Sequence, residues 1–301
     1  MSAIQGGMAT YGDCQWLVAR DRVGNRVVAS SYHGHKEFAD RLVAGVLLLL
    51  TAPLLATLMA LVRITSRGPS LFSQPRVGKN GRPFFMHKIR TMPVDAEAAT
   101  GPVWGGTHDS RATRVGRVLR RLHLDELPQL FNVVTGEMSL VGPRPERPEF
   151  VSVLSAAIPG YLDRIVVRPG ITGLAQLNLP ADTDLDSVRR KLTLDREYIS
   201  RATLWLDVRL VVCTALRVFK LPEHGILVWF GLQRTVVPPA SSGASSEAAD
   251  GDGFGVPLAS LVRQVNVRRR AEAARRHAAV PYGNRRMAAS RLVDSKKPKP
   301  R

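Results

Sequence analysis

The most prominent hydrophobic feature of the chain is one uninterrupted apolar run, Leu42 to Val62, which contains no charged residue. As a helix rising ~1.5 Å per residue, this run would be about 31 Å long, close to the ~30 Å hydrocarbon core of a bilayer. It begins too far along the chain, and is too long, for a cleaved signal peptide. The pattern therefore predicts a membrane-inserted helix.

Two features of this run leave its topology open. Pro53 stands at its midpoint, where a proline removes a backbone hydrogen bond and bends a helix. Basic residues flank both ends, and the positive-inside rule would put both flanks on the cytoplasmic face. A re-entrant helix that bends at Pro53 and returns satisfies both features. A single span is the alternative, and a buried helix of a soluble protein is less favoured because the run is apolar all round. The flanking residues are Lys36 and Arg41 before the run, and Arg63 and Arg67 after it.

A β-hairpin is predicted for residues 71–92. Asn80-Gly81 lies between two extended, partly apolar runs, and this dipeptide favours a primed turn. The strands are basic, which predicts contact with lipid headgroups or with a phosphate. For Lys79 and Arg82 the preferred interpretation is instead a solvated, charged hairpin. The basic residues are Arg76, Lys79, Arg82, Lys88 and Arg90.

Helical spacing returns after the hairpin. Residues 111–121 hold five arginines, and apolar residues recur among them at helical intervals, which predicts a basic amphipathic helix. A second helix is expected to start near Asp125 and to end at Thr135-Gly136, with Pro128 in its first turn. Further along we expect a rigid proline segment at 141–150, a loop with a short strand at 168–180, two helices in 182–219 and an interfacial element around 228–237.

Composition and charge add a partner class to this picture. The chain has 301 residues, 45% of them hydrophobic, and a formal net charge of +18. The final stretch from residue 239 holds thirteen Lys and Arg against five Asp and Glu, so the body of the chain is basic as well. Such an excess indicates an anionic partner: a nucleic acid, a phosphorylated substrate or an acidic membrane surface. Cys14 and Cys213 form no disulfide or metal pattern, which fits a reducing compartment.

The adjacent acids Asp125 and Glu126 are the strongest candidates for chemistry, because they open a predicted helix in a very basic protein. Helix capping is the simpler interpretation, and a catalytic pair is the other. For the basic candidate residues, too, a purely structural role remains an alternative to substrate binding. Arg144 could be a surface residue of a proline loop, Lys88 and Arg90 could contact headgroups, and Arg168 could pair with a carboxylate.

From about Lys36 to Lys220 the chain resembles the bacterial sugar transferases known as monotopic phosphoglycosyltransferases. The resemblance rests on "SLFSQPRVGKNGRPFFMHKIRTM", "RRLHLDELPQLFNVVTGEMSLVGPRPE", "VRPGITGLAQ" and "LTLDREYI", in family order. Two departures are present. His123 replaces a small hydroxyl residue before "LDE", and "AQLNLPADTD" replaces the "AQVNGR" of many members, which leaves the sugar undetermined.

The resemblance implies roles for particular residues. Asp125 and Glu126 would be the catalytic pair and would hold Mg²⁺, and Pro53 would mark the break of a re-entrant helix. Asp195 and Glu146 would support the site. The cations expected to bind substrate phosphate are Arg120, Arg144, Lys88, Arg90 and Arg168.

The resemblance also implies a reaction. Asp125 would attack the β-phosphate of a UDP-sugar, form an aspartyl-phosphosugar and release UMP; undecaprenyl phosphate would then take the phosphosugar. We expect the enzyme at the bacterial inner membrane with its catalytic domain on the cytoplasmic face, in contact with anionic lipids and supplying downstream glycosyltransferases. A membrane-anchored nucleic-acid binder and a scaffold are the alternatives; the sequence lacks a nucleic-acid recognition motif, and the intact "LDELPQL" argues against the scaffold.

The expected fold is α+β and mostly helical: a re-entrant membrane helix, then a small cytoplasmic catalytic domain with a β-hairpin and interfacial amphipathic helices. The expected segments are an N-terminal extension at 1–35, the membrane helix at 36–66, the catalytic domain at 67–237 and a basic tail, expected to be disordered, at 238–301.

Overall fold

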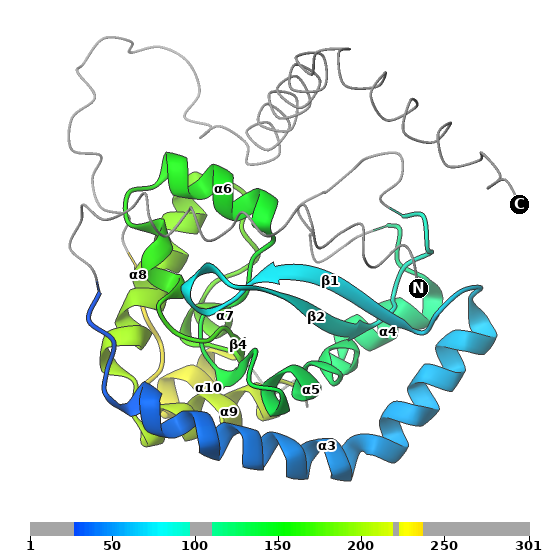
Figure 1. Ribbon diagram of the computed structural model, residues 1–301. Coiled ribbons are helices and arrows are strands. Elements are labelled where there is room, and N and C mark those ends of the chain that lie inside the picture. The colour runs from blue at the N-terminus through cyan, green and yellow to red at the C-terminus, as the bar shows by residue number, and fades with distance from the viewer. Residues whose placement is uncertain (1–26, 97–109, 219–222, 237–301) are drawn as a thin grey trace, which may run out of the picture. The chain divides into compact units, whose positions relative to one another are not determined.

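A computed structural model describes residues 27–96, 110–218 and 223–236 (Figure 1). Most of the predicted N-terminal extension and the predicted basic tail lie outside the described residues. The described part is mostly helical, with two small sheets, so the predicted α+β class is confirmed.

The apolar run lies inside one continuous helix, α3 (Tyr32–Thr65), of 34 residues. Its length and composition would allow it to cross a membrane. The expected break at Pro53 is not an interruption: the helix continues through the proline, and its axis changes direction along its length (Figure 1). Pro53 has no N–H to donate to the carbonyl of Leu49, and Thr57 Oγ1 donates at 2.9 Å to the carbonyl of Pro53 itself, so this hydroxyl does not replace the missing bond.

Both halves of α3 pack against the rest of the protein. Ala44 is buried in a cluster with residues of β2 (Pro83–Ile89) and α5 (Gln129–Val134). Val62, near the other end of α3, is buried with Ile89 of β2 and Leu119 of α4 (Arg114–Arg121). The residues between these two anchors are largely exposed apolar side chains, such as Leu49 at 77% and Leu50 at 69%.

The predicted hairpin is confirmed. Strand β1 (Leu71–Val77) pairs antiparallel with β2, and the short helix η2 (Lys79–Gly81) lies at the tip. Asn80 and Gly81 both have positive φ, at 56° and 78°, as a primed turn requires. Arg82 N donates to Lys79 O at 3.2 Å and closes this turn.

A left-handed residue separates the two helices that follow the hairpin. α4 ends before His123, whose φ is 54°, and the chain then forms a short 3₁₀ turn, η3 (Leu124–Glu126). Regular helix resumes only at α5. The prediction that a helix begins at Asp125 is therefore wrong: the acidic pair lies in the tight turn before it. The predicted helix end is confirmed, because Gly136 adopts φ 81° directly after α5.

The remaining elements follow α5 in the chain and include the second small sheet. β3 (Ser139–Val141) pairs in parallel with β4 (Gly170–Thr172), which is the short strand expected in that loop. Around them lie helical elements whose largest hydrophobic cluster includes Leu194, Tyr198 and Leu210. These elements are α6 (Pro148–Ala157), η4 (Tyr161–Ile165), α7 (Leu174–Asn178), α8 (Leu185–Arg201), α9 (Leu204–Val218) and α10 (Glu223–Trp229).

Candidate active site

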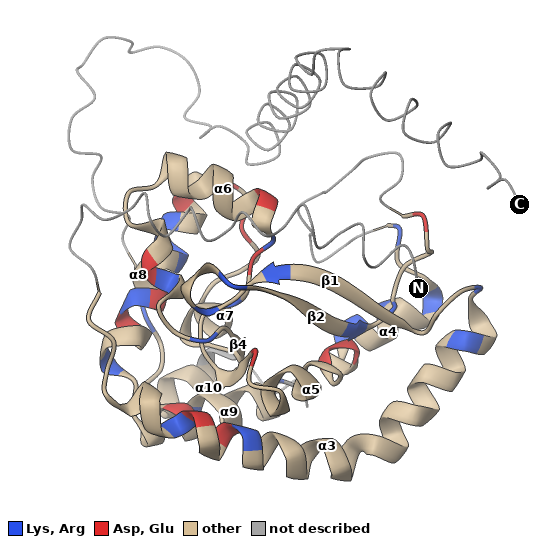
Figure 2. Cartoon of the chain, viewed as in Figure 1, with Lys and Arg blue, Asp and Glu red and all other residues tan. Residues whose placement is uncertain are grey.

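Glu126 is the centre of a charge cluster drawn from three separate elements. Lys88 of β2 donates to Glu126 Oε1 at 2.7 Å, and Arg144 donates Nη2 to the same oxygen at 2.8 Å. Figure 2 shows basic residues of β2 beside the acidic turn that precedes α5. The structure thus brings together Lys88, Glu126 and Arg144, which are far apart in the sequence but were all predicted as site residues.

The turn geometry explains how Asp125 joins this cluster. The left-handed His123 reverses the chain between α4 and η3, and Glu126 N then donates to His123 O at 3.2 Å. Asp125 is only 6% exposed, and neither η3 nor α5 has a side-chain cap. Asp125 therefore lies in the first turn of η3 without capping a helix through its side chain.

A buried asparagine that the sequence analysis overlooked ties β2 to α5. Asn132 Nδ2 donates to Phe85 O at 2.8 Å, and Asn132 Oδ1 accepts from His87 N at 3.1 Å. Lys88 follows His87 directly, so these bonds fix the lysine relative to the acidic turn. An amide on the buried side of "QLFNVV" was the available signal, because a buried polar group needs partners.

The two acids have opposite electrostatic environments. Burial raises the pKa of Asp125, Lys88 opposes that rise, and the neighbouring Glu126 charge reinforces it. Burial also disfavours ionised Glu126, but Arg144 and Lys88 outweigh it and hold the pKa of this carboxyl well below its usual range. Burial lowers the pKa of Lys88, and Glu126 counters that shift. The site therefore holds one firmly ionised carboxylate next to one whose charge is partly destabilised.

Arg120 lies close to this pair, whereas Arg90 and Arg168 have other partners. Arg120 is half-buried in the last turn of α4, and its charge lowers the pKa of Asp125. Arg90 donates to Arg67 O at 2.7 Å and to Ser66 O at 2.9 Å, just after α3. Arg168 pairs with Glu37 of α3 at 2.8 Å. These contacts favour structural roles for Arg90 and Arg168.

Glu146, two residues after Arg144 in the chain, and Asp195 belong to one buried ionic network around Arg164. Glu146 lies 3.0 Å from Lys191 and 3.6 Å from Arg164, and Asp195 lies 2.9 Å from Arg164. Burial alone would raise the pKa of Glu146, but these cations lower it to about 2. Neither acid contacts Glu126 directly, so their geometry fits the supporting role expected for them.

The oxygen atoms left over at the pair fit a divalent cation. The side chains of Lys88 and Arg144 both contact Oε1 of Glu126. Within the described ranges, Oε2 of Glu126 and the carboxylate of Asp125 have no hydrogen bond or ion pair. No group of three metal-binding side chains gathers among the described residues. Mg²⁺ commonly takes one or two carboxylates and completes its shell with water and substrate phosphate, so the chemistry of Asp125 and Glu126 is compatible with such an ion.

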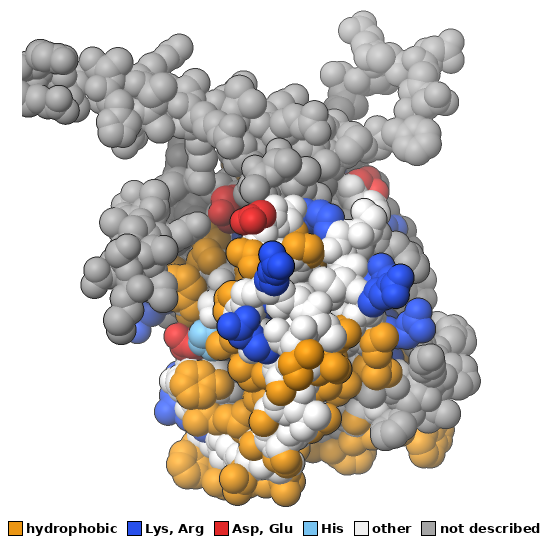
Figure 3. Space-filling view, turned by 90° about the vertical axis from the view of Figure 1, so that its right-hand side faces the viewer, with side chains coloured by type: hydrophobic (Ala, Val, Ile, Leu, Met, Phe, Trp, Pro, Cys, Tyr) orange, Lys and Arg blue, Asp and Glu red, His pale blue; other side chains and the backbone are white. Residues whose placement is uncertain are grey.

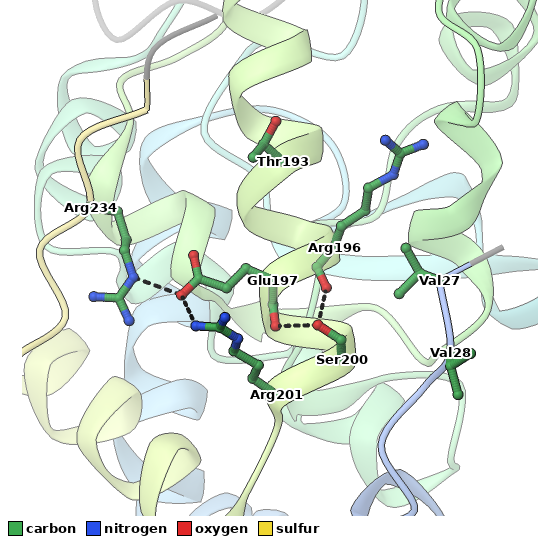
Figure 4. Close-up of a pocket in the computed structure, with 8 residues that line it drawn as sticks. All are labelled: Val27, Val28, Thr193, Arg196, Glu197, Ser200, Arg201 and Arg234. Atoms are coloured by element: carbon green, nitrogen blue, oxygen red, sulfur yellow. Dashed lines mark hydrogen bonds and ion pairs between the residues drawn. The ribbon is translucent and has the colours of Figure 1, made fainter. Parts of the chain in front are cut away.

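A separate open hollow lies on α8, away from these residues. Figure 4 shows Arg234 and Arg201 reaching Glu197 there, with Val27 and Val28 on the opposite side. None of the predicted site residues lines this hollow. The charged cluster around Glu126 therefore remains the candidate active site.

Comparison with known proteins shows which family this chain belongs to. The family described as bacterial sugar transferase matches residues 31–221. The chain is 41% identical over 194 residues to a UDP-N-acetylgalactosamine-undecaprenyl-phosphate N-acetylgalactosaminephosphotransferase of Aeromonas hydrophila, covering 64% of this chain and 46% of that protein. It is 41% identical over 185 residues to a UDP-glucose:undecaprenyl-phosphate glucose-1-phosphate transferase of Xanthomonas campestris pv. campestris, covering 61% and 38%.

A third relative is closer to this chain in length than the first two are. It is a UDP-glucose:undecaprenyl-phosphate glucose-1-phosphate transferase of Caulobacter vibrioides, 42% identical over 187 residues, covering 60% of this chain and 67% of that protein. The chain thus spans less than half of the first two relatives and about two thirds of this one. The family match covers more than half of the chain and includes every predicted site residue, from Pro53 to Asp195. The chain therefore belongs to the bacterial sugar transferase family.

Proposed function

We propose that this protein transfers a sugar-1-phosphate from a UDP-sugar to undecaprenyl phosphate. The observation that carries the proposal is the Asp125-Glu126 pair, with Asp125 buried and Lys88 and Arg144 paired to the half-buried Glu126, within the matched family region. The names of the relatives support the substrate classes, and they include both an N-acetylgalactosamine and a glucose enzyme. The nucleic-acid-binding and scaffold alternatives have no comparable support.

The chemistry that we propose has two balanced steps. A carboxylate oxygen of Asp125 attacks the β-phosphorus, the bond to the bridging oxygen breaks, and UMP leaves with that electron pair. An oxygen of undecaprenyl phosphate then attacks the same phosphorus and displaces the Asp125 carboxylate, which yields the lipid-linked diphosphosugar. Neither step needs a net proton transfer.

The cations of the site suit this reaction, because phosphoryl transfer depends mainly on positioning and on neutralising phosphate charge. The guanidinium of Arg144 can bind phosphate oxygens as a planar fork, and Lys88 adds a point charge. Arg120 lies near enough to act on Asp125 electrostatically. Glu126 holds Lys88 and Arg144 beside the nucleophile until substrate phosphate competes for them.

A Mg²⁺ ion held by Asp125 and Glu126 would neutralise diphosphate charge when bound. We expect purified protein in detergent to release UMP from at least one UDP-sugar when undecaprenyl phosphate and Mg²⁺ are supplied. EDTA should abolish this release, and excess Mg²⁺ should restore it. A panel of UDP-sugars identifies the donor. UMP release that is undiminished in EDTA would refute the metal assignment, and no release from any UDP-sugar would refute the proposed function.

A re-entrant insertion of α3 is part of the proposal. Lys36, near the start of α3, lies 2.6 Å from Asp207 of α9, while Val62, near its end, packs on Ile89 and Leu119. A straight crossing would carry one of these anchors about 30 Å away through hydrocarbon. Insertion into one leaflet, with the bend near Pro53, keeps both anchors in the catalytic domain.

The distribution of surface side chains supports this insertion. Figure 3 shows hydrophobic side chains gathered over the lower part of one face, with Lys and Arg side chains above them. Exposed Trp205 of α9 and Trp229 of α10 are suited to the membrane interface, where indole rings favour the headgroup level. We infer that the catalytic domain lies on the cytoplasmic face of the inner membrane, in contact with anionic lipids, and hands its product to downstream glycosyltransferases.

Cysteine labelling tests the insertion. We expect Ser31→Cys and Ser66→Cys, placed at the two ends of α3, to react with an impermeant maleimide only after the cytoplasmic face is opened. Cys14 and Cys213 would first be replaced by Ser to remove background. Labelling of the Ser66→Cys protein from the periplasmic side of intact cells would show that α3 spans the membrane.

A further inference from the structure

The segment that carries Arg144 is held at every backbone carbonyl from residue 143 to residue 146. Pro143 O accepts from Gly170 N at 2.9 Å, and Glu146 O accepts from Val77 N at 2.9 Å. Between them, Arg144 O accepts from Arg164 Nη2 at 3.0 Å, and Pro145 O accepts from Arg76 Nη1 at 3.1 Å. Two of the four donors are therefore arginine side chains.

Arg164 is fixed in turn by buried partners. Its side chain is 4% exposed, and it lies 2.9 Å from Asp195 and 3.6 Å from Glu146. Its Nη1 also donates to Tyr161 Oη at 2.8 Å. Because two carboxylates and a phenol hold this guanidinium, it cannot move without leaving buried charge unpaired.

Arg144 reaches Glu126 from this held backbone. Prolines on both sides fix their own φ angles, and Arg164 holds the carbonyl of Arg144 itself. The Arg144 guanidinium then needs only its side-chain torsions to place Nη2 at 2.8 Å from Glu126. A displacement of a reacting group by about 1 Å can cost ~10²-fold in rate, so the position of this backbone matters for catalysis.

We propose that Arg164 is a positioning residue for sugar-phosphate transfer, acting through the carbonyl of Arg144 rather than on the substrate. The inference rests on the proposed function, because it assigns Arg144 to substrate phosphate. A lysine at position 164 would keep a positive charge near Asp195 and Glu146. Its single ammonium could not reproduce the planar fork that reaches both acids, Tyr161 and the Arg144 carbonyl.

The test is a double-mutant cycle on UMP release, using R164K, R144K and the double variant. We expect R164K to lower kcat by ~10-fold or more with a smaller change in KM, since misplacement weakens transition-state contacts most. In the R144K background the same change should cost less than about twofold, because the fork that it positions is already gone.

Arg196→Lys is the matched control. Arg196 Nε donates to Asp163 at 2.9 Å and its Nη2 donates to Gly160 O at 3.0 Å, so it also joins a carboxylate to a backbone carbonyl without contacting residues 143–146. Its kcat should stay within about twofold of wild type. Asp195→Asn offers a second way to loosen Arg164 and should lower kcat in the same direction, again without added effect in R144K.

The outcomes separate the two proposals. If wild-type protein releases no UMP, the proposed function fails and this inference fails with it. If wild type is active but R164K and D195N match it, or if their losses multiply with that of R144K, Arg164 does not position Arg144. An R164K protein that fails to fold leaves D195N to decide, and an equal loss in R196K would indicate general destabilisation instead.

Discussion

Replacing Asp125 with Asn should reduce UMP release by at least ~10³-fold, because the amide has no anionic oxygen to attack phosphorus. The two side chains have nearly the same size, so this buried position should tolerate the change. The measurement is UMP production from the preferred UDP-sugar, with and without undecaprenyl phosphate. Thermal unfolding in detergent shows whether the variant is folded.

Asp186→Asn is the control for this loss. Asp186 is 55% exposed at its side chain and, in the described part of the chain, its ion pair is with Arg189 on the same helix, so the change should leave UMP release within about twofold. A D125N protein that keeps a tenth or more of wild-type activity would remove Asp125 from the nucleophile role.

Glu126→Gln should lower kcat by roughly 10²–10³-fold, because it removes the charge that holds Lys88 and Arg144 beside the nucleophile. It should also shift the pH profile of activity toward acid on both sides. Glu126 raises the pKa of Asp125, so without it Asp125 ionises at lower pH. Glu126 also counters the burial that lowers the pKa of Lys88, so without it Lys88 loses its proton at lower pH.

The measurement is kcat/KM across pH at saturating Mg²⁺, which separates these shifts from weakened metal binding. Glu197→Gln is the control, because Glu197 also pairs with two arginines, Arg234 and Arg201, but away from the site. An unshifted pH profile in E126Q, together with near wild-type kcat, would contradict the electrostatic account of the site.

Local sequence signals predicted the parts of the fold that depend on neighbouring residues. Asn80-Gly81 predicted the hairpin because few residues tolerate two successive positive φ angles. The prediction that a helix starts at Asp125 was wrong because His123 adopts a left-handed backbone conformation, which could not be predicted from a single histidine in the sequence. That conformation tightens the following turn and places Asp125 before the regular helix.

Partners across the sequence were harder to predict. A family motif gave Lys88, Glu126 and Arg144 as site residues, but periodicity could not show that they meet. Arg90 and Arg168 fit the same basic pattern, yet their contacts are with the segment after α3 and with Glu37. Only the three-dimensional arrangement distinguishes cations beside the acidic pair from cations that hold the scaffold together.

The central claim is that Asp125 carries the phosphosugar covalently between the two steps. It is tested most directly by incubating the protein with its UDP-sugar and Mg²⁺ without undecaprenyl phosphate, quenching with acid and measuring the mass of the intact protein. The account predicts an added mass of one phosphosugar, located by peptide mapping on Asp125, absent in D125N and lost on addition of undecaprenyl phosphate. No adduct, with UMP released only when undecaprenyl phosphate is present, would instead indicate direct transfer between the two substrates.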